Sequence, residues 1–142
     1  MWYASRVADS LDDEALWAAF QAATLPAPQW THIAHLRVAW LHLARYPLAE
    51  AHLRMRAGIL RLNATHGLVE TPARGYHETL TWTWLAIVAA VRARTPTADS
   101  AAFARDHAPA RDAPLAYYTR ERLFGLDARA RFVPPDLAPL PA

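Results

Sequence analysis

Apolar residues recur every three or four positions along most of this chain, which is the spacing of helices with one buried face. The first such segment opens with Ser10 and Asp13, whose separation is that of a capping box. Its apolar side consists of Leu11, Ala15, Leu16, Ala19, Phe20 and Ala23. Pro26 and Pro28 predict the end of this helix, because proline interrupts the helical hydrogen bonds.

Three longer helices are predicted in the middle of the chain. Thr31 is a good N-cap for the first of them, which should run over 32–45. Pro47 suits the first turn of the second, which Gly67 can end with a left-handed turn. The third should span 76–92, and its sequence is apolar on nearly every side. We therefore expect it to be the central and most buried helix.

The last third of the chain has shorter elements. Ser100 can cap a helix that ends near His107, and Thr119 can cap one or two further turns. The segment 133–142 is rich in proline and is expected to be extended, either as a strap over the helices or as a flexible end, as is 1–9. No segment alternates with period two. The prediction is a single all-α domain over 1–142, a helical bundle of about four main helices plus short C-terminal ones.

The amino-acid composition excludes several classes of function. Cysteine is absent, so disulfides, thiolate nucleophiles and sulfur-ligated metals are excluded. All 15 basic residues are arginine, which excludes lysine chemistry and suggests a bacterial coding bias toward GC-rich codons. The formal net charge is only +2, and acidic residues are interspersed, so nucleic acid is not an expected partner. Neither a secretory signal nor an apolar run of membrane-spanning length is present, and we expect a cytoplasmic protein with no membrane partner.

Histidines form a stripe on the predicted helix over 32–45. At roughly 100° per residue, positions 32, 35, 39 and 42 fall within about a quarter of the circumference, and histidine occupies three of them: His32, His35 and His42. His32 and His35 are close enough on one face to bind a single ion. His42 lies too far along the helix to join them.

A second polar pair, His77 and Glu78, stands at the predicted start of the helix over 76–92. Neighbours on a helix point about 100° apart, so only one of the two should be a direct ligand. If the chain runs up, down and up, this start lies beside the start of the histidine-bearing helix. The hypothesis is that His32, His35 and His77 bind a divalent metal, which could be Zn, Ni, Fe or Mn. Glu78 would then either form a hydrogen bond to one of these ligands or act as a catalytic base.

The same residues have a second interpretation, which gives two function hypotheses. In the first, the protein binds a metal and acts as a metal-dependent enzyme. In the second, the histidines and Glu78 form a buried hydrogen-bond network without metal, and the protein is a non-enzymatic small-molecule binder or interaction module. No organic cofactor is indicated, since glycine occurs only at positions 58, 67, 75 and 125 and no phosphate loop is present.

Aromatic residues suggest where a small molecule could bind. Trp30, Tyr76 and Thr81 are the predicted walls of a pocket beside the histidines. Other aromatic residues on or near the same helices are Trp40, Trp82, Trp84 and the pair Tyr117–Tyr118. Filling of the core is the more common role of such residues. The arginines at 120, 122, 129 and 131 are expected to tie the C-terminal segment to the bundle rather than to bind a ligand.

Two motifs carry a resemblance to a known type of protein. These are Trp30-x-His32-x-x-His35-Leu36 and the pentapeptide Gly75-Tyr76-His77-Glu78-Thr79, followed by the stretches 121–124 and 135–137. The chain from Trp30 onward resembles a family of small uncharacterised bacterial all-helical proteins. The resemblance implies that His32, His35, His77 and Glu78 belong to one recurrent pattern, and it brings no substrate with it.

Overall fold

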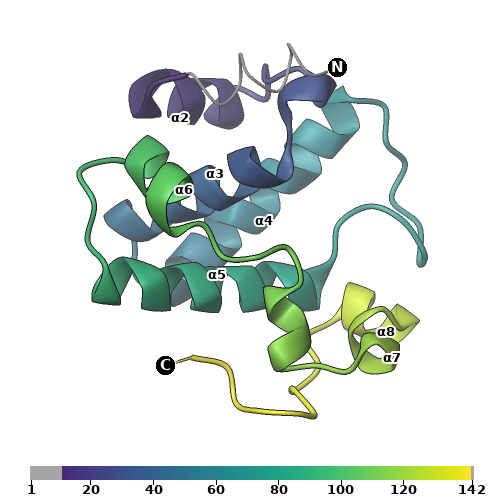
Figure 1. The fold of residues 1–142 in the computed structure, drawn as a ribbon. Helices are drawn as coiled ribbons and strands as arrows, with labels where there is room; N and C mark the ends of the chain where they lie inside the picture. Colours follow the sequence, from purple (N-terminus) through teal and green to yellow (C-terminus); the bar gives the residue numbers. More distant parts are fainter. Residues whose placement is uncertain (1–10, 142) are drawn as a thin grey trace.

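In the computed structural model, which describes residues 11–141, the chain folds into helices, and the described part contains no β-strand (Figure 1). The longer helices are α2 (Asp13–Gln21), α3 (His32–Arg45), α4 (Leu48–Thr65), α5 (Glu78–Arg94) and α6 (Ser100–His107). Shorter elements are η1 (Ala27–Gln29), η2 (Ala113–Ala116), α7 (Arg120–Leu123) and α8 (Leu126–Ala130). The predicted all-α helical bundle is confirmed.

The caps of α3 and the end of α4 are those that the sequence predicts. The Thr31 hydroxyl accepts a hydrogen bond from the backbone N–H of Ala34 at 3.1 Å. Pro47 stands immediately before α4, and Gly67 follows its end with φ of +74°. Glycine adopts this left-handed conformation without the clash that a Cβ atom would cause.

Three predicted helix starts are wrong by one or two residues. The N-cap of α2 is Asp12, which accepts from Ala15, while Ser10 lies outside the described residues. Helix α5 begins at Glu78 rather than at Tyr76, because the His77 side chain caps it by accepting from the N–H of Leu80. Helix α6 is capped by Asp99, not by Ser100. For α6, Asp99 stands directly before Ser100 and offers an equally suitable acceptor, so tertiary contacts decide between the two.

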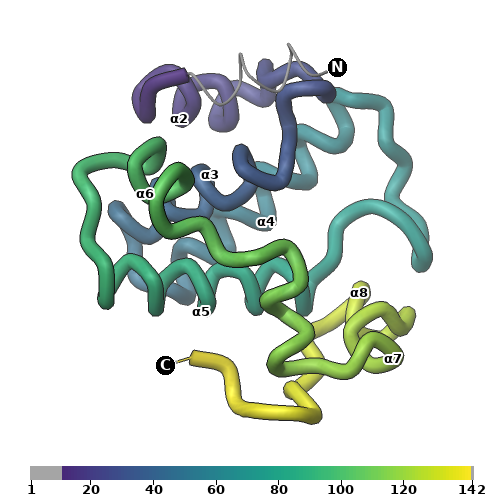
Figure 2. The backbone as a smooth tube through the Cα atoms, viewed as in Figure 1, coloured from purple at the N-terminus to yellow at the C-terminus, as the bar shows by residue number. Residues whose placement is uncertain are grey.

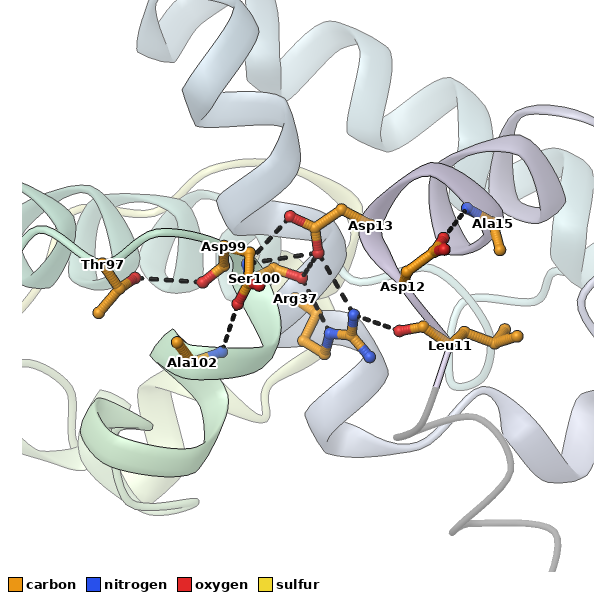
Figure 3. Close-up of polar contacts among 9 residues, drawn as sticks. All are labelled: Leu11, Asp12, Asp13, Ala15, Arg37, Thr97, Asp99, Ser100 and Ala102. Carbon is orange, nitrogen blue, oxygen red and sulfur yellow. Dashed lines mark hydrogen bonds and ion pairs between the residues drawn. The ribbon is translucent and has the colours of Figure 1, made fainter.

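The side chain of Ser100 does not cap α6 because it belongs to a polar cluster with Asp13 and Arg37 (Figure 3). The Ser100 hydroxyl donates to the Asp13 carboxylate, and its backbone N–H donates to the same group. Arg37, which is 1% exposed, donates from Nε to Ser100 Oγ at 2.9 Å and forms an ion pair with Asp13 at 3.3 Å. The Leu11 carbonyl also accepts from Arg37. The cluster therefore joins α2, α3 and α6.

Helices α3, α4 and α5 pack against one another and form the centre of the fold (Figures 1 and 2). Eight residues of α3 are buried, against six of the longer α5. The expectation that the helix at 76–92 is the most buried is thus wrong, and α3 has that position. Trp82 and Trp84 of α5 stay partly exposed, because Trp82 stacks on His52 and Trp84 lines a cavity, so neither is enclosed in the core.

The C-terminal third forms a second, smaller apolar cluster beside the start of α5, with α7 and α8 at that end in Figure 2. Its buried members are Tyr118, Leu123, Ala128 and Val133. The segment after α8 is extended and tied down: the N–H of Leu137 donates to the Tyr117 carbonyl, and the Asp136 carboxylate accepts from Thr119. The predicted strap is therefore present in the described part of that segment.

Of the four arginines expected to tie the C-terminal segment to the bundle, Arg129 does so, by donating to the Gly75 carbonyl at 2.8 Å. Arg122 donates to the Pro134 carbonyl at 2.6 Å and Arg131 pairs with Asp127, so both bonds lie within the C-terminal third. Arg120 instead lines a surface cavity. Among the described residues no helix is both long and apolar enough to cross a membrane.

Candidate functional site

A cavity of about 470 Å³ lies where the starts of α3 and α5 meet the second half of α4. We call it the first cavity. Its aromatic and polar walls are Trp30, His32, His35, Asn63, Tyr76, His77, Thr81, Trp84 and Arg111, and its apolar walls are Leu36, Ala39, Met55, Ile59, Leu68, Leu80 and Leu85, with Gly75 completing it. The structure thus brings the two helix starts together at one end, as the up-down-up path predicts.

His35 is held rigidly at the wall of this cavity. Its Nδ1–H donates to the Thr31 carbonyl at 2.7 Å, and its ring stacks on Trp30 with the centroids 3.6 Å apart. Burial lowers the pKa of His35 to about 4, against the opposing effect of the Thr31 hydrogen bond. The ring is therefore neutral at pH 7. Since Nδ1 carries the proton, Nε2 has a lone pair that can accept a hydrogen bond.

His32 lies one helical turn before His35 and contacts a different aromatic ring. Its imidazole meets Trp84 edge to face, with the centroids 5.0 Å apart. Its Nε2 is buried and makes no hydrogen bond within the described part of the chain. Burial, and secondarily the charge of Arg111, lowers the pKa of His32. This ring too favours its neutral form.

His77 uses both ring nitrogens for structure. Nδ1 accepts from the N–H of Leu80 at 3.0 Å and so caps α5, while Nε2 donates to the Leu123 carbonyl at 2.8 Å. The second bond joins the start of α5 to α7. Burial lowers the pKa of His77, which keeps the ring neutral and both bonds formed.

The predicted metal ligands His32, His35 and His77 all line the first cavity, but their bonding does not suit one ion. A metal ligand needs a free ring nitrogen, and His77 would have to give up its bond to Leu80 or to Leu123. Within residues 11–141, no three His, Asp or Glu side chains are grouped so that they could hold a metal ion. The ligand set stays a prediction, and the arrangement described does not fit it.

Glu78, predicted to stand behind the ligands or to act as a base, does not line the first cavity. Its Oε1 accepts from the Tyr76 hydroxyl at 2.6 Å and from His52 Nε2 at 3.0 Å, and Arg56 lies 3.6 Å from its Oε2. Burial opposes ionisation of Glu78, but the hydrogen bonds from Tyr76 and His52 and the nearby charges outweigh it and lower its pKa. His77 is the N-cap of α5 and Glu78 its first residue, and the two side chains have different partners.

His52 is a partner that the sequence gave no reason to expect. It comes from the start of α4, 26 positions before Glu78, and its ring also stacks on Trp82 at 3.8 Å. Burial, with the hydrogen bond to Glu78, raises the pKa of Tyr76, so its hydroxyl keeps its proton and donates. The hydrogen bonds of Glu78 therefore connect α4 to α5.

The three predicted pocket walls, Trp30, Tyr76 and Thr81, all line the first cavity. Trp84 lines it as well, and its spacing of seven from His77 on one helix face would have indicated this. The other aromatic residues lie elsewhere: Trp40 stacks near Phe103, Trp82 contacts His52, and Tyr118 is in the C-terminal cluster. Nothing in the sequence indicated that Arg111 is a wall, because it lies in a turn between Pro109 and Pro114 that has no periodic pattern.

A second cavity of about 390 Å³ adjoins the first and opens toward the C-terminal third. The two share His32, Leu80, Trp84 and Arg111. The second cavity adds walls from η2, α7 and their neighbours: Asp112, Pro114, Leu115, Arg120, Leu123 and Phe124.

The comparisons with known proteins add no relative to this description. No protein-family model matches the chain, and neither a curated protein nor a solved structure shows significant similarity to it.

Proposed function

We propose that this protein binds a small, flat, largely apolar molecule in the first cavity, and that His35 accepts a hydrogen bond from a donor group of that molecule. The observation that carries the proposal is the state of His35. Its ring is neutral, stacked on Trp30 and bonded through Nδ1, which leaves Nε2 as the acceptor at the wall of an aromatic cavity.

The size and composition of the first cavity support this choice of ligand. Pockets for small molecules commonly measure about 300–1,000 Å³, and the value of 470 Å³ lies in that range. Trp30 and Trp84 offer aromatic surfaces, and apolar side chains of α3, α4 and α5 form most of the remainder. No acidic residue is among the described lining, so a cationic ligand has no counter-charge there.

The geometry favours this function over the metal-dependent one. A metal would need His77, whose two nitrogens hold Leu80 and Leu123, and a base would need Glu78, which bonds to Tyr76 and His52 outside the cavity. A binding role needs neither change. We therefore propose a binding protein and assign no reaction.

Isothermal titration calorimetry with two matched probes tests the proposal. 2-Naphthol has a hydroxyl that can donate to His35, whereas 2-methoxynaphthalene has the same ring system and no donor. We expect 2-naphthol to bind about threefold to tenfold more tightly, which corresponds to one neutral hydrogen bond. His35→Phe should remove this preference while keeping the stack on Trp30.

His107→Phe is the matched control, because His107 is exposed at the end of α6 and away from both cavities. It should leave the preference unchanged. If neither probe binds the folded protein, or if His35→Phe keeps the preference, the proposal is wrong. Stoichiometric metal in the purified protein that is lost in His35→Phe would support the metal-dependent function instead.

A further inference from the structure

The second cavity extends the first toward a set of charged side chains. The two cavities share His32, Leu80, Trp84 and Arg111, so a molecule that fills the first reaches the second past Trp84 and Arg111. A flat ligand longer than a single ring would therefore meet Arg111 at the junction.

The charges along this path are predominantly positive. Arg111 lines both cavities and Arg120 lines the second, whereas Asp112 is the one acidic residue among the described walls of either. Arg111 also lies close enough to His32 for its charge to act on that ring.

Arg111 and Arg120 differ from their neighbours in what they bind. Arg122 and Arg129 donate to backbone carbonyls, and Arg131 pairs with Asp127. Within the described part of the chain, the side chains of Arg111 and Arg120 form neither an ion pair nor a hydrogen bond, and both residues are exposed. Their guanidinium groups thus remain available to an anion.

We infer that the ligand is a flat aromatic acid, whose ring system lies in the first cavity and whose carboxylate is bound by Arg111 at the junction with the second. The inference rests on the proposed function and adds the chemical class of the ligand. A guanidinium group can bind a carboxylate through two parallel hydrogen bonds, which a lone ammonium cannot match. Arg120 lies further along the second cavity and adds positive charge there.

The test compares 6-hydroxy-2-naphthoate with the neutral 6-hydroxy-2-naphthamide by calorimetry. Both have the ring and the hydroxyl of 2-naphthol, and they differ in charge at the other end. Since Arg111 is exposed, we expect a preference for the acid of about fivefold, decreasing at high salt. Arg111→Gln should abolish the preference, so that this variant binds the acid and the amide equally tightly.

Arg94→Gln is the control, because it removes the same charge from an exposed position at the end of α5 that lines neither cavity. It should keep the preference. If the acid binds no more tightly than the amide, or if Arg94→Gln and Arg111→Gln lose the preference equally, the inference is overturned while binding of 2-naphthol still supports the proposed function. If 2-naphthol itself does not bind, both proposals fall together.

Discussion

At the scale of single residues, the environment of each histidine decides what it can do. His35 and His77 both line the first cavity and both favour the neutral form, yet only His35 has a nitrogen left for a ligand. The sequence predicted that these two residues lie near each other, because an up-down-up path brings the starts of their helices to the same end. It could not assign their partners, since Leu123 bonds to His77 from 46 positions away.

The pKa of His35 makes a prediction about acid stability. An unfolded histidine titrates near 6.5, whereas burial lowers the pKa of folded His35 to about 4. Between these values the unfolded chain binds a proton that the folded chain does not. The contribution of His35 to stability is therefore complete above about pH 6.5 and is lost as the pH falls toward 4, at up to about 1.4 kcal/mol per pH unit.

Urea unfolding across this range should show a smaller pH dependence for His35→Phe than for the natural chain. Some dependence should remain, because burial also lowers the pKa of His32, His42 and His77. An imidazole of His35 that titrates near 6.5 in the folded protein, followed by NMR, would contradict the burial described.

At the scale of elements, the helices were largely predictable and their exact starts were not. The apolar spacing located α3, α4 and α5, and the up-down-up path brought the starts of α3 and α5 together. The predicted cap of α6 is wrong because serine and aspartate are both preferred N-cap residues, and Ser100 and Asp99 stand side by side. The buried cluster with Asp13 and Arg37 takes the Ser100 hydroxyl, and a contact between residues 87 positions apart has no local signal.

Ser100→Ala should therefore destabilise the protein by about 1–3 kcal/mol, because it removes a partner from the buried Arg37 and from Asp13. Thr65→Ala is a suitable control, since the Thr65 hydroxyl donates to the carbonyl of Arg61 in its own helix at an exposed position. Its effect should be within about 0.5 kcal/mol. Equal midpoints of urea unfolding for the two variants would show that the cluster does not join α2, α3 and α6.

At the scale of the whole molecule, two apolar clusters meet at the start of α5. The larger one is formed mainly by α2, α3, α4 and α5, and the smaller one by residues of the C-terminal third. His77 joins them by capping α5 with one nitrogen and bonding to Leu123 with the other. The walls of the two cavities come from residues between Trp30 and Phe124, on both sides of this junction.

The most direct test of a ligand in the first cavity uses the indole N–H signals of the tryptophans in a ¹⁵N-NMR titration with 2-naphthol. Trp30 and Trp84 line the cavity, whereas Trp17, Trp40 and Trp82 do not and serve as internal controls. The proposed function predicts saturable shifts of the Trp30 and Trp84 signals, with the three controls nearly unchanged. Shifts confined to the control tryptophans, or no shift at saturating 2-naphthol, would contradict it.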